Sequence, residues 1–290
     1  MMNRSFADSR IQQIPTTAGH SLSARVAGTI AGDPTATVIL DASLGAGKSM
    51  WEPVADELLA LEPGIRLVAY DRAGMGLSGA PRDNRHVDDM INDALCVIDA
   101  QAVDGVPLIL VGHFLGGLIA RMAALKMEKM RRPPDGVILI EPGDELFGWS
   151  TDPRTVALMR STTFLSRISD KFGMFDVFAS ASLPEDLPHR KLMRLDTTGK
   201  AYDEEARAFF REMKILSVQL PPMPESPAVL IASSKSYGEF VRARGNQITV
   251  VDAGCGHIVP LRAPILVADY ISVFVNNAIN ARGKNNIGQN

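Results

Sequence analysis

The amino-acid sequence predicts an α/β protein: a mostly parallel central sheet with helices on both faces and one helical insertion. Short, almost wholly apolar runs bounded by turn residues are typical of parallel strands buried on both faces. Stretches with helical periodicity separate these runs at short intervals, which favours helices that cross over the sheet. The alternation stops after Glu145 and resumes near Ala228, so an insertion divides the sheet-forming sequence.

The elements before the insertion begin with a hairpin, because the turn sequence Ala18-Gly19-His20 separates two short extended segments. Strands and helices then alternate. The expected strands are residues 11–15, 21–27, 37–41, 65–70, 107–111 and 137–140, and the expected helices are residues 50–61, 87–101 and 115–130.

After the insertion the same alternation returns, with strands expected at 228–232 and 247–251 and helices at 239–244 and 264–277. Residues 281–290 are polar and lack periodicity, which predicts a disordered tail. The sequence therefore divides into a first core part at 1–146, a helical cap at 147–223, a second core part at 224–280 and the tail.

Composition excludes several classes of function. The chain has 290 residues and a net charge of −3, which offers no electrostatic footprint for nucleic acid. No apolar run reaches the roughly 18 residues that span a membrane, and no signal segment is expected at the N-terminus. Two cysteines, Cys96 and Cys255, do not form a disulfide framework, so a soluble, cytoplasmic protein is expected. The oligomeric state stays open.

Residues 112–116, with the sequence Gly-His-Phe-Leu-Gly, form the most informative motif. They follow a buried strand and open a helix, which is the setting of the nucleophile elbow, Gly-x-Ser-x-Gly. The glycines permit a sharp, strained turn. Only the central residue departs from the pattern, because Phe114 occupies the position of the nucleophile.

With this motif and two others, the sequence resembles the α/β-hydrolase superfamily, in its lid-bearing branch of small-molecule esterases and lyases. Residues 70–79 resemble the loop after the fourth strand of such enzymes, and residues 253–257 resemble the loop that presents the catalytic histidine. The resemblance implies an α/β-hydrolase fold in which residues 147–223 form the lid. It also implies His257 as the base, and the backbone amides of Leu44 and Leu115 as oxyanion donors.

The acid that would support His257 is less clear. The position after Ala232, where relatives carry an aspartate, is occupied by serines. Some relatives take the acid from the loop after the sixth strand, so Asp144 is the first choice, followed by Glu141 and then Glu239. Its role would be to fix the tautomer of His257 and to stabilise its cation.

Phe114 has no atom that could act as a nucleophile or transfer a proton. Four interpretations follow: catalysis without a covalent intermediate, lost function with the ring as a filler, a relocated nucleophile, or an engineered or erroneous residue. Ser43 is the best candidate for a relocated nucleophile or a substrate hydrogen bond, as a hydroxyl from this loop is in the related hydroxynitrile lyases; it could equally bond a loop amide. Cys255 is the other candidate nucleophile.

A rival motif occupies the same loop as Ser43. Residues 42–49 satisfy a relaxed P-loop pattern between a strand and a helix. The elbow and the histidine loop have no place in a nucleotide enzyme, so we interpret Lys48 and Ser49 as an exposed helix start.

We expect a small hydrophobic ligand, because the cap is rich in Met and Phe, which line apolar pockets. The expected function is a cofactor-independent and metal-free lyase, isomerase or cyclase step of the kind found in secondary metabolism, with His257 as acid and base. The alternatives are a non-catalytic small-molecule-binding homologue and an ester or amide hydrolase that uses Ser43. The expected pocket residues are Phe114, Trp51, Trp149, Met174 and Phe175.

Overall fold

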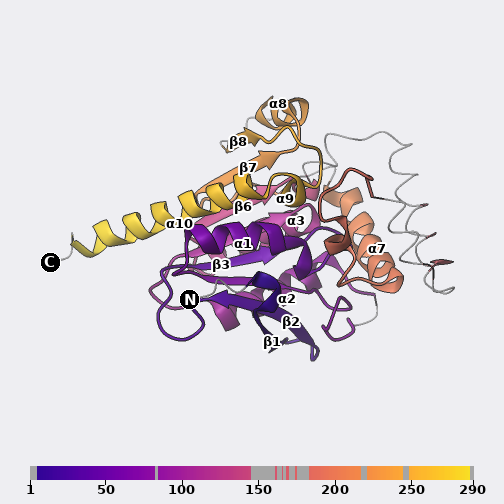
Figure 1. Ribbon diagram of the computed structural model, residues 1–290, viewed down its shortest axis with the longest axis horizontal. Helices are drawn as coiled ribbons and strands as arrows, with labels where there is room; N and C mark the ends of the chain where they lie inside the picture. Colours follow the sequence, from indigo (N-terminus) through magenta and orange to yellow (C-terminus); the bar gives the residue numbers. More distant parts are fainter. Residues whose placement is uncertain are drawn as a thin grey trace.

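The computed structural model describes residues 5–81, 84–144, 183–216, 221–243 and 248–287, with a few isolated positions between 161 and 174. Its centre is an eight-stranded sheet in the order β1-β2-β4-β3-β5-β6-β7-β8 (Figure 1). The strands are β1 (Arg10–Pro15), β2 (Ser21–Gly28), β3 (Thr37–Asp41), β4 (Arg66–Tyr70), β5 (Leu108–His113), β6 (Gly136–Ile140), β7 (Ala228–Ala232) and β8 (Thr249–Asp252).

The strand directions confirm a mostly parallel sheet. Strand β2 runs antiparallel to both of its neighbours, β1 and β4, while all pairs from β4 to β8 are parallel. The predicted opening hairpin is therefore present at one edge of the sheet. The parallel strands end at one common edge, where the loops that follow them come together.

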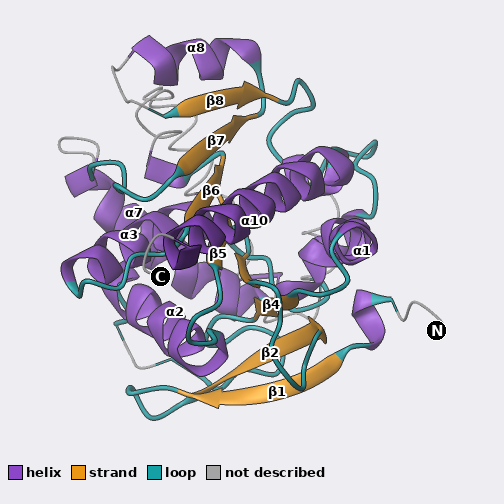
Figure 2. Ribbon diagram, turned by 90° about the vertical axis from the view of Figure 1, so that its left-hand side faces the viewer, coloured by secondary structure: helices purple, strands orange, loops and turns teal. Residues whose placement is uncertain are grey.

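Helices cover both faces of the sheet, as Figure 2 shows. The helical segments are η1 (Phe6–Asp8), η2 (Lys48–Trp51), α1 (Glu52–Leu61), α2 (Val87–Gln101), α3 (Leu115–Lys129), η3 (Arg190–Met193), α7 (Gly199–Leu216), α8 (Lys235–Ala243), α9 (Val259–Arg262) and α10 (Pro264–Ile287). Helices α2 and α3 enclose one buried apolar cluster, and α1 and α10 enclose the other. Along β3, Val38 and Leu40 belong to one cluster and Ile39 to the other, because successive side chains of a strand point to opposite faces.

The C-terminal segment differs from the expectation. Helix α10 continues to Ile287, so most of the expected disordered tail is helical. Figure 1 shows α10 extending beyond the sheet on the side away from α7. The guanidinium of Arg282 donates two hydrogen bonds of 2.8 Å to the carboxylate of Asp135, and this ion pair ties the end of the helix to the core. A polar composition alone did not reveal that distant partner.

The described part of the insertion is helical or irregular. Residues 183–216 contain η3 and α7 and no strand, which agrees with the expected helical character. The role of residues 147–223 as a lid stays a prediction. Among the described residues, no helix is long and apolar enough to cross a membrane.

Candidate active site

A strained turn joins β5 to α3 and carries Phe114 at its tip. Phe114 has φ of 52° and ψ of −107°, backbone angles that residues other than glycine rarely adopt. A Cβ atom on Gly112 would lie 2.1 Å from the carbonyl oxygen of Gly116, and one on Gly116 would lie 2.3 Å from that of Asp41. The turn therefore requires both glycines, as the motif predicted. The Phe114 N–H donates to Ile140 O at 2.9 Å, which fixes the turn to the neighbouring strand end.

The side chain of His257 is paired with a buried carboxylate. Its Nδ1 lies 3.1 Å from Oε2 of Glu141, whose side chain is only 1% exposed. The other oxygen of Glu141 accepts the N–H of Ser233 at 2.5 Å, so the carboxylate is held from both sides. A carboxylate at Nδ1 places a proton there and leaves Nε2 as the basic atom. The imidazole is partly exposed, which leaves it accessible to a substrate.

This pairing corrects the choice of acid. Asp144, the first choice, binds Arg121 of α3 instead, with 2.6 Å between Oδ2 and Nη1. Glu141, the second choice, is the residue that contacts His257, because it follows β6 directly and its N–H donates to Ile231 O of the adjacent β7 at 3.0 Å. That position directs it toward the loop after β8. Glu239 is exposed on α8 and lies 4.0 Å from Lys235.

Aromatic rings surround the tip of the turn. The Phe114 ring lies 5.1 Å from the His257 ring in an edge-on arrangement with 88° between their planes. The Phe114 ring also lies 5.1 Å from the ring of Phe209, which comes from the inserted helix α7. Phe114 is 3% exposed. The imidazole of His257 is therefore in contact with the benzyl group of Phe114 at the tip of the turn.

His113, which precedes Phe114, forms a hydrogen bond to the loop that carries His257. Its Nε2 lies 2.9 Å from the carbonyl oxygen of His257 and donates to it. Burial, reinforced by the neighbouring His257, holds the pKa of His113 well below its ordinary value. His113 is thus a neutral hydrogen-bond donor that fixes the backbone of His257. The sequence motif contains His113 but gives no sign of this role.

One of the two expected oxyanion donors lies at the start of α3, and the other lies in the loop after β3. Leu115 is the first residue of α3, a position whose N–H has no acceptor in its own helix. Leu44 lies in the loop after β3 and packs against the same apolar cluster as Phe114 and Leu115. Their role as oxyanion donors stays a prediction.

Ser43 is buried in the loop after β3. Its carbonyl oxygen accepts a hydrogen bond of 2.6 Å from Nη2 of Arg72, and its N–H points to the sulfur of Met50 at 3.2 Å. Within the described part of the chain, no hydrogen bond joins its hydroxyl to His257. Its role as a relocated nucleophile stays a hypothesis, as does that of Cys255, whose thiol pKa is raised by burial.

The segment that resembles a P-loop has a structural explanation. Lys48 is buried, not exposed as expected, and its ammonium group binds the carboxylates of Asp71 and Asp196, the latter at 3.2 Å. The Ser49 N–H donates to Asp196 at 2.8 Å. A lysine committed to two buried carboxylates is not available to a nucleotide phosphate. No cluster of potential metal ligands occurs among the described residues.

The expected pocket residues are only partly brought together. Trp51 is fully buried in the apolar cluster beneath α1 and α10, whereas Phe114 belongs to the cluster beneath α2 and α3, so the structure separates these two side chains. Met174 is 55% exposed. Trp149 and Phe175 lie outside the described residues. Phe209, which the prediction of pocket residues omitted, is the cap side chain that contacts Phe114.

Relatives with known structures share this architecture. A thermophilic esterase from Thermogutta terrifontis superimposes with a TM-score of 0.67 at 18% identity, covering 93% of this chain and 99% of that one. An epoxide hydrolase from Vigna radiata gives a TM-score of 0.69 at 14% identity, covering 94% and 99%. At such identities the likeness shows the fold alone.

Similarity of sequence is more local. Carbamate hydrolase RutD of Variovorax paradoxus (strain S110) is 39% identical over 89 residues, which are 30% of this chain and 32% of that protein. The matched stretches thus span only about a third of the length of such curated relatives. The model of the alpha/beta hydrolase family matches residues 38–270, which include the turn at Phe114, Glu141 and His257. The chain therefore belongs to the alpha/beta hydrolase family.

Proposed function

We propose that this chain is a cofactor-independent enzyme that moves protons on a small hydrophobic substrate without forming a covalent intermediate. The observation that carries the proposal is the pairing of His257 with the buried Glu141 directly beside the ring of Phe114. The pair supplies a base, whereas Phe114 at the tip of the turn has a hydrocarbon side chain that cannot act as a nucleophile. Lyase, isomerase and cyclisation steps need such a base and no nucleophile.

The chemistry would proceed at Nε2 of His257. This atom accepts a proton from the substrate, and the imidazolium that results is stabilised by the carboxylate of Glu141. The negative charge left on a substrate oxygen would be accepted by the N–H groups of Leu44 and Leu115. Phe114 and Phe209 offer an apolar surface against which the substrate would pack. The proton is returned to the substrate from the same imidazolium, so the enzyme is regenerated.

Removal of His257 tests the proposal. We expect the wild-type protein in deuterium oxide to exchange the α-protons of a small apolar ketone such as benzylacetone, followed by NMR. His257→Ala should slow this exchange by roughly 10²- to 10⁴-fold, the usual contribution of a general base. His189→Asn, which changes an exposed histidine of the insertion, is the matched control and should exchange at the wild-type rate. If wild type and His257→Ala exchange such ketones equally slowly, the non-catalytic binding protein is the better description.

The second candidate is an ester or amide hydrolase that uses Ser43. The local sequence similarity to carbamate hydrolase RutD of Variovorax paradoxus (strain S110) favours it. A fluorophosphonate probe distinguishes it from the first, because such a probe labels activated serines. Labelling at Ser43 that is lost in Ser43→Ala and His257→Ala would support this hydrolase and displace the first proposal.

A further inference from the structure

One buried guanidinium group forms hydrogen bonds to the loop after β3. Arg72, in the loop after β4, is 1% exposed. Its Nη1 donates to Asp41 Oδ1 at 2.6 Å and to Ala42 O at 2.7 Å, and its Nη2 donates to Ser43 O at 2.6 Å. A single side chain thus binds three consecutive residues where the strand becomes the loop. Asp41 is held further by the hydroxyl of Tyr70 at 2.5 Å.

The other side of this guanidinium is bound by the insertion. Glu205 of α7 accepts from Arg72 Nε at 2.6 Å and from Nη2 at 2.9 Å, and it is also 1% exposed. Its Oε2 accepts the N–H of Gly45 at 3.0 Å as well. Burial disfavours the Arg72 cation, but the carboxylates of Glu205 and Asp41 outweigh burial and raise the pKa of Arg72 above its ordinary value. Arg72 therefore stays a cation throughout the accessible pH range.

These bonds fix the orientation of the Leu44 N–H. The carbonyl of Ser43 and the N–H of Leu44 belong to one planar, trans peptide unit and point in opposite directions. Because Arg72 holds the Ser43 oxygen, the Leu44 N–H must point away from Arg72. The next peptide unit, which joins Leu44 to Gly45, is held through the Gly45 N–H by Glu205. Both peptide planes that flank Leu44 are thus set by this one ion pair.

We propose that Glu205 is a positioning residue by which the inserted helix α7 sets the oxyanion-donor loop after β3. When α7 is docked, Glu205 accepts hydrogen bonds from Arg72, and the direction of the Leu44 N–H is fixed. When α7 moves away, Gly45 and Arg72 lose a charged partner, and the loop is free to turn. The inference gives the Leu44 N–H the role described under the proposed function and rests on it in that respect, but the mechanical coupling does not depend on which reaction is catalysed.

The coupling is measured by hydrogen–deuterium exchange of the full-length protein, followed by mass spectrometry. The reporter is the N–H of Ala46, which donates to Ser43 O at 3.1 Å, whereas Glu205 accepts the N–H of Gly45. In Glu205→Ala we expect this amide to exchange roughly tenfold faster or more, the ratio expected for losing a charge-assisted hydrogen bond. Glu205→Gln keeps the shape and an acceptor for Gly45 but loses the ion pair, so its effect should be intermediate.

Asp203→Asn is the matched control, because Asp203 lies on the same helix and, among the described residues, its carboxylate pairs with Arg207 of that helix, at 3.0 Å, and not with Arg72. It should leave the exchange of Ala46 unchanged. In the ketone assay, the Glu205 variants should lower kcat with KM nearly unchanged, since the oxyanion develops only during reaction. Ala46 protection equal to wild type in folded Glu205→Gln and Glu205→Ala would overturn the inference. Faster loop exchange in a protein that never exchanges the ketone would retain the coupling and remove the proposed function.

Discussion

Phe114→Ser is expected to convert the protein into an esterase. The turn holds residue 114 at its tip with φ of 52°, and the His257 ring lies 5.1 Å from the ring that serine would replace. A hydroxyl at this position could therefore pass its proton to Nε2 of His257, with Glu141 supporting the cation. We expect hydrolysis of p-nitrophenyl butyrate to rise by roughly 10³-fold or more over wild type, a conservative fraction of what a serine nucleophile contributes.

Three further variants show whether this gain comes from the assembled site. Phe114→Ala opens the same space without a hydroxyl and should stay at the wild-type rate. Adding His257→Ala or Glu141→Gln to Phe114→Ser should remove most of the gained activity. A fluorophosphonate should label the protein only in variants that carry serine at position 114. If Phe114→Ser folds normally but neither hydrolyses the ester nor takes the label, His257 and the turn are not aligned for catalysis, and the proposed function loses its basis.

Arg121→Ala is expected to cause the largest loss of stability. Arg121 is 1% exposed and holds the chain at both ends of the insertion. It binds Asp144 just before the insertion, at 2.6 Å, and the carbonyl oxygens of Pro221 and Pro222 at the end of the insertion, the latter at 3.0 Å. Its removal leaves the Asp144 carboxylate buried without its cation. We expect the free energy of unfolding to fall by roughly 3–5 kcal/mol, measured by denaturant titration.

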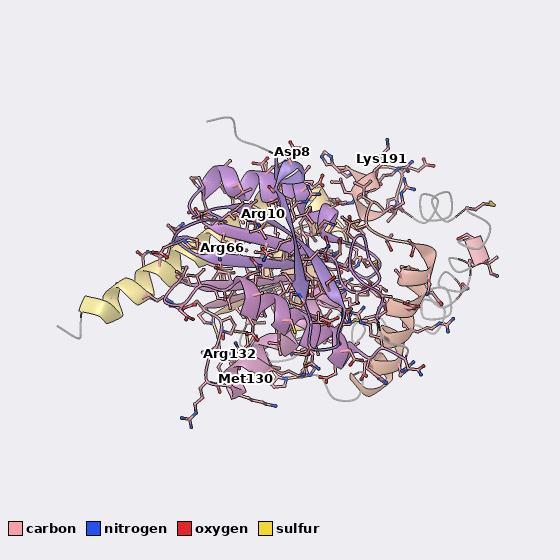
Figure 3. All side chains as sticks on the ribbon, turned by 90° about the horizontal axis from the view of Figure 1, so that it is seen from below. Asp8, Arg10, Arg66, Met130, Arg132 and Lys191 are labelled. Atoms are coloured by element: carbon pink, nitrogen blue, oxygen red, sulfur yellow. The ribbon has the colours of Figure 1, made fainter. Side chains whose placement is uncertain are left out.

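Two comparisons isolate the cause of that loss. Arg132→Ala removes an exposed arginine that projects from the surface in Figure 3 and pairs with the exposed Asp99. That change should cost less than about 1 kcal/mol. Replacing both partners, in Arg121→Met with Asp144→Leu, should recover much of the loss because no charge is left buried. If the single variant Arg121→Ala were as stable as Arg132→Ala, the buried ion pair would not be what holds the two ends of the insertion together.

Much of the architecture was accessible from sequence because it depends on local patterns. Buried parallel strands produce apolar runs, and the turn at Phe114 needs glycine at 112 and 116, whatever residue lies between them. The same applies to the histidine loop, which its glycines and position after the last strand identify. Such features are encoded by neighbouring residues, so no knowledge of distant contacts was required.

The features that sequence reasoning missed depend on contacts between distant residues. Glu141 and Asp144 are both acids in the loop after β6, but the folded backbone, which has φ of 47° at Glu141, brings Glu141 to His257 and Asp144 to Arg121. Arg72 and Glu205 are 133 residues apart, and Arg282 and Asp135 are 147 apart. Burial and partner of such charges follow from the tertiary fold, so the Lys48 side chain was wrongly expected to be exposed.

The turn at Phe114 also bears on how this chain could change its chemistry. The codons for phenylalanine and serine differ by a single base, so one point mutation separates this turn from a nucleophile. The positive φ of a bulky residue lowers the stability of the fold by roughly 1–3 kcal/mol. A turn that relaxed to a negative φ would regain this free energy. A lineage that keeps this strained bend keeps open a short mutational route between a turn with a hydroxyl at its tip and one without.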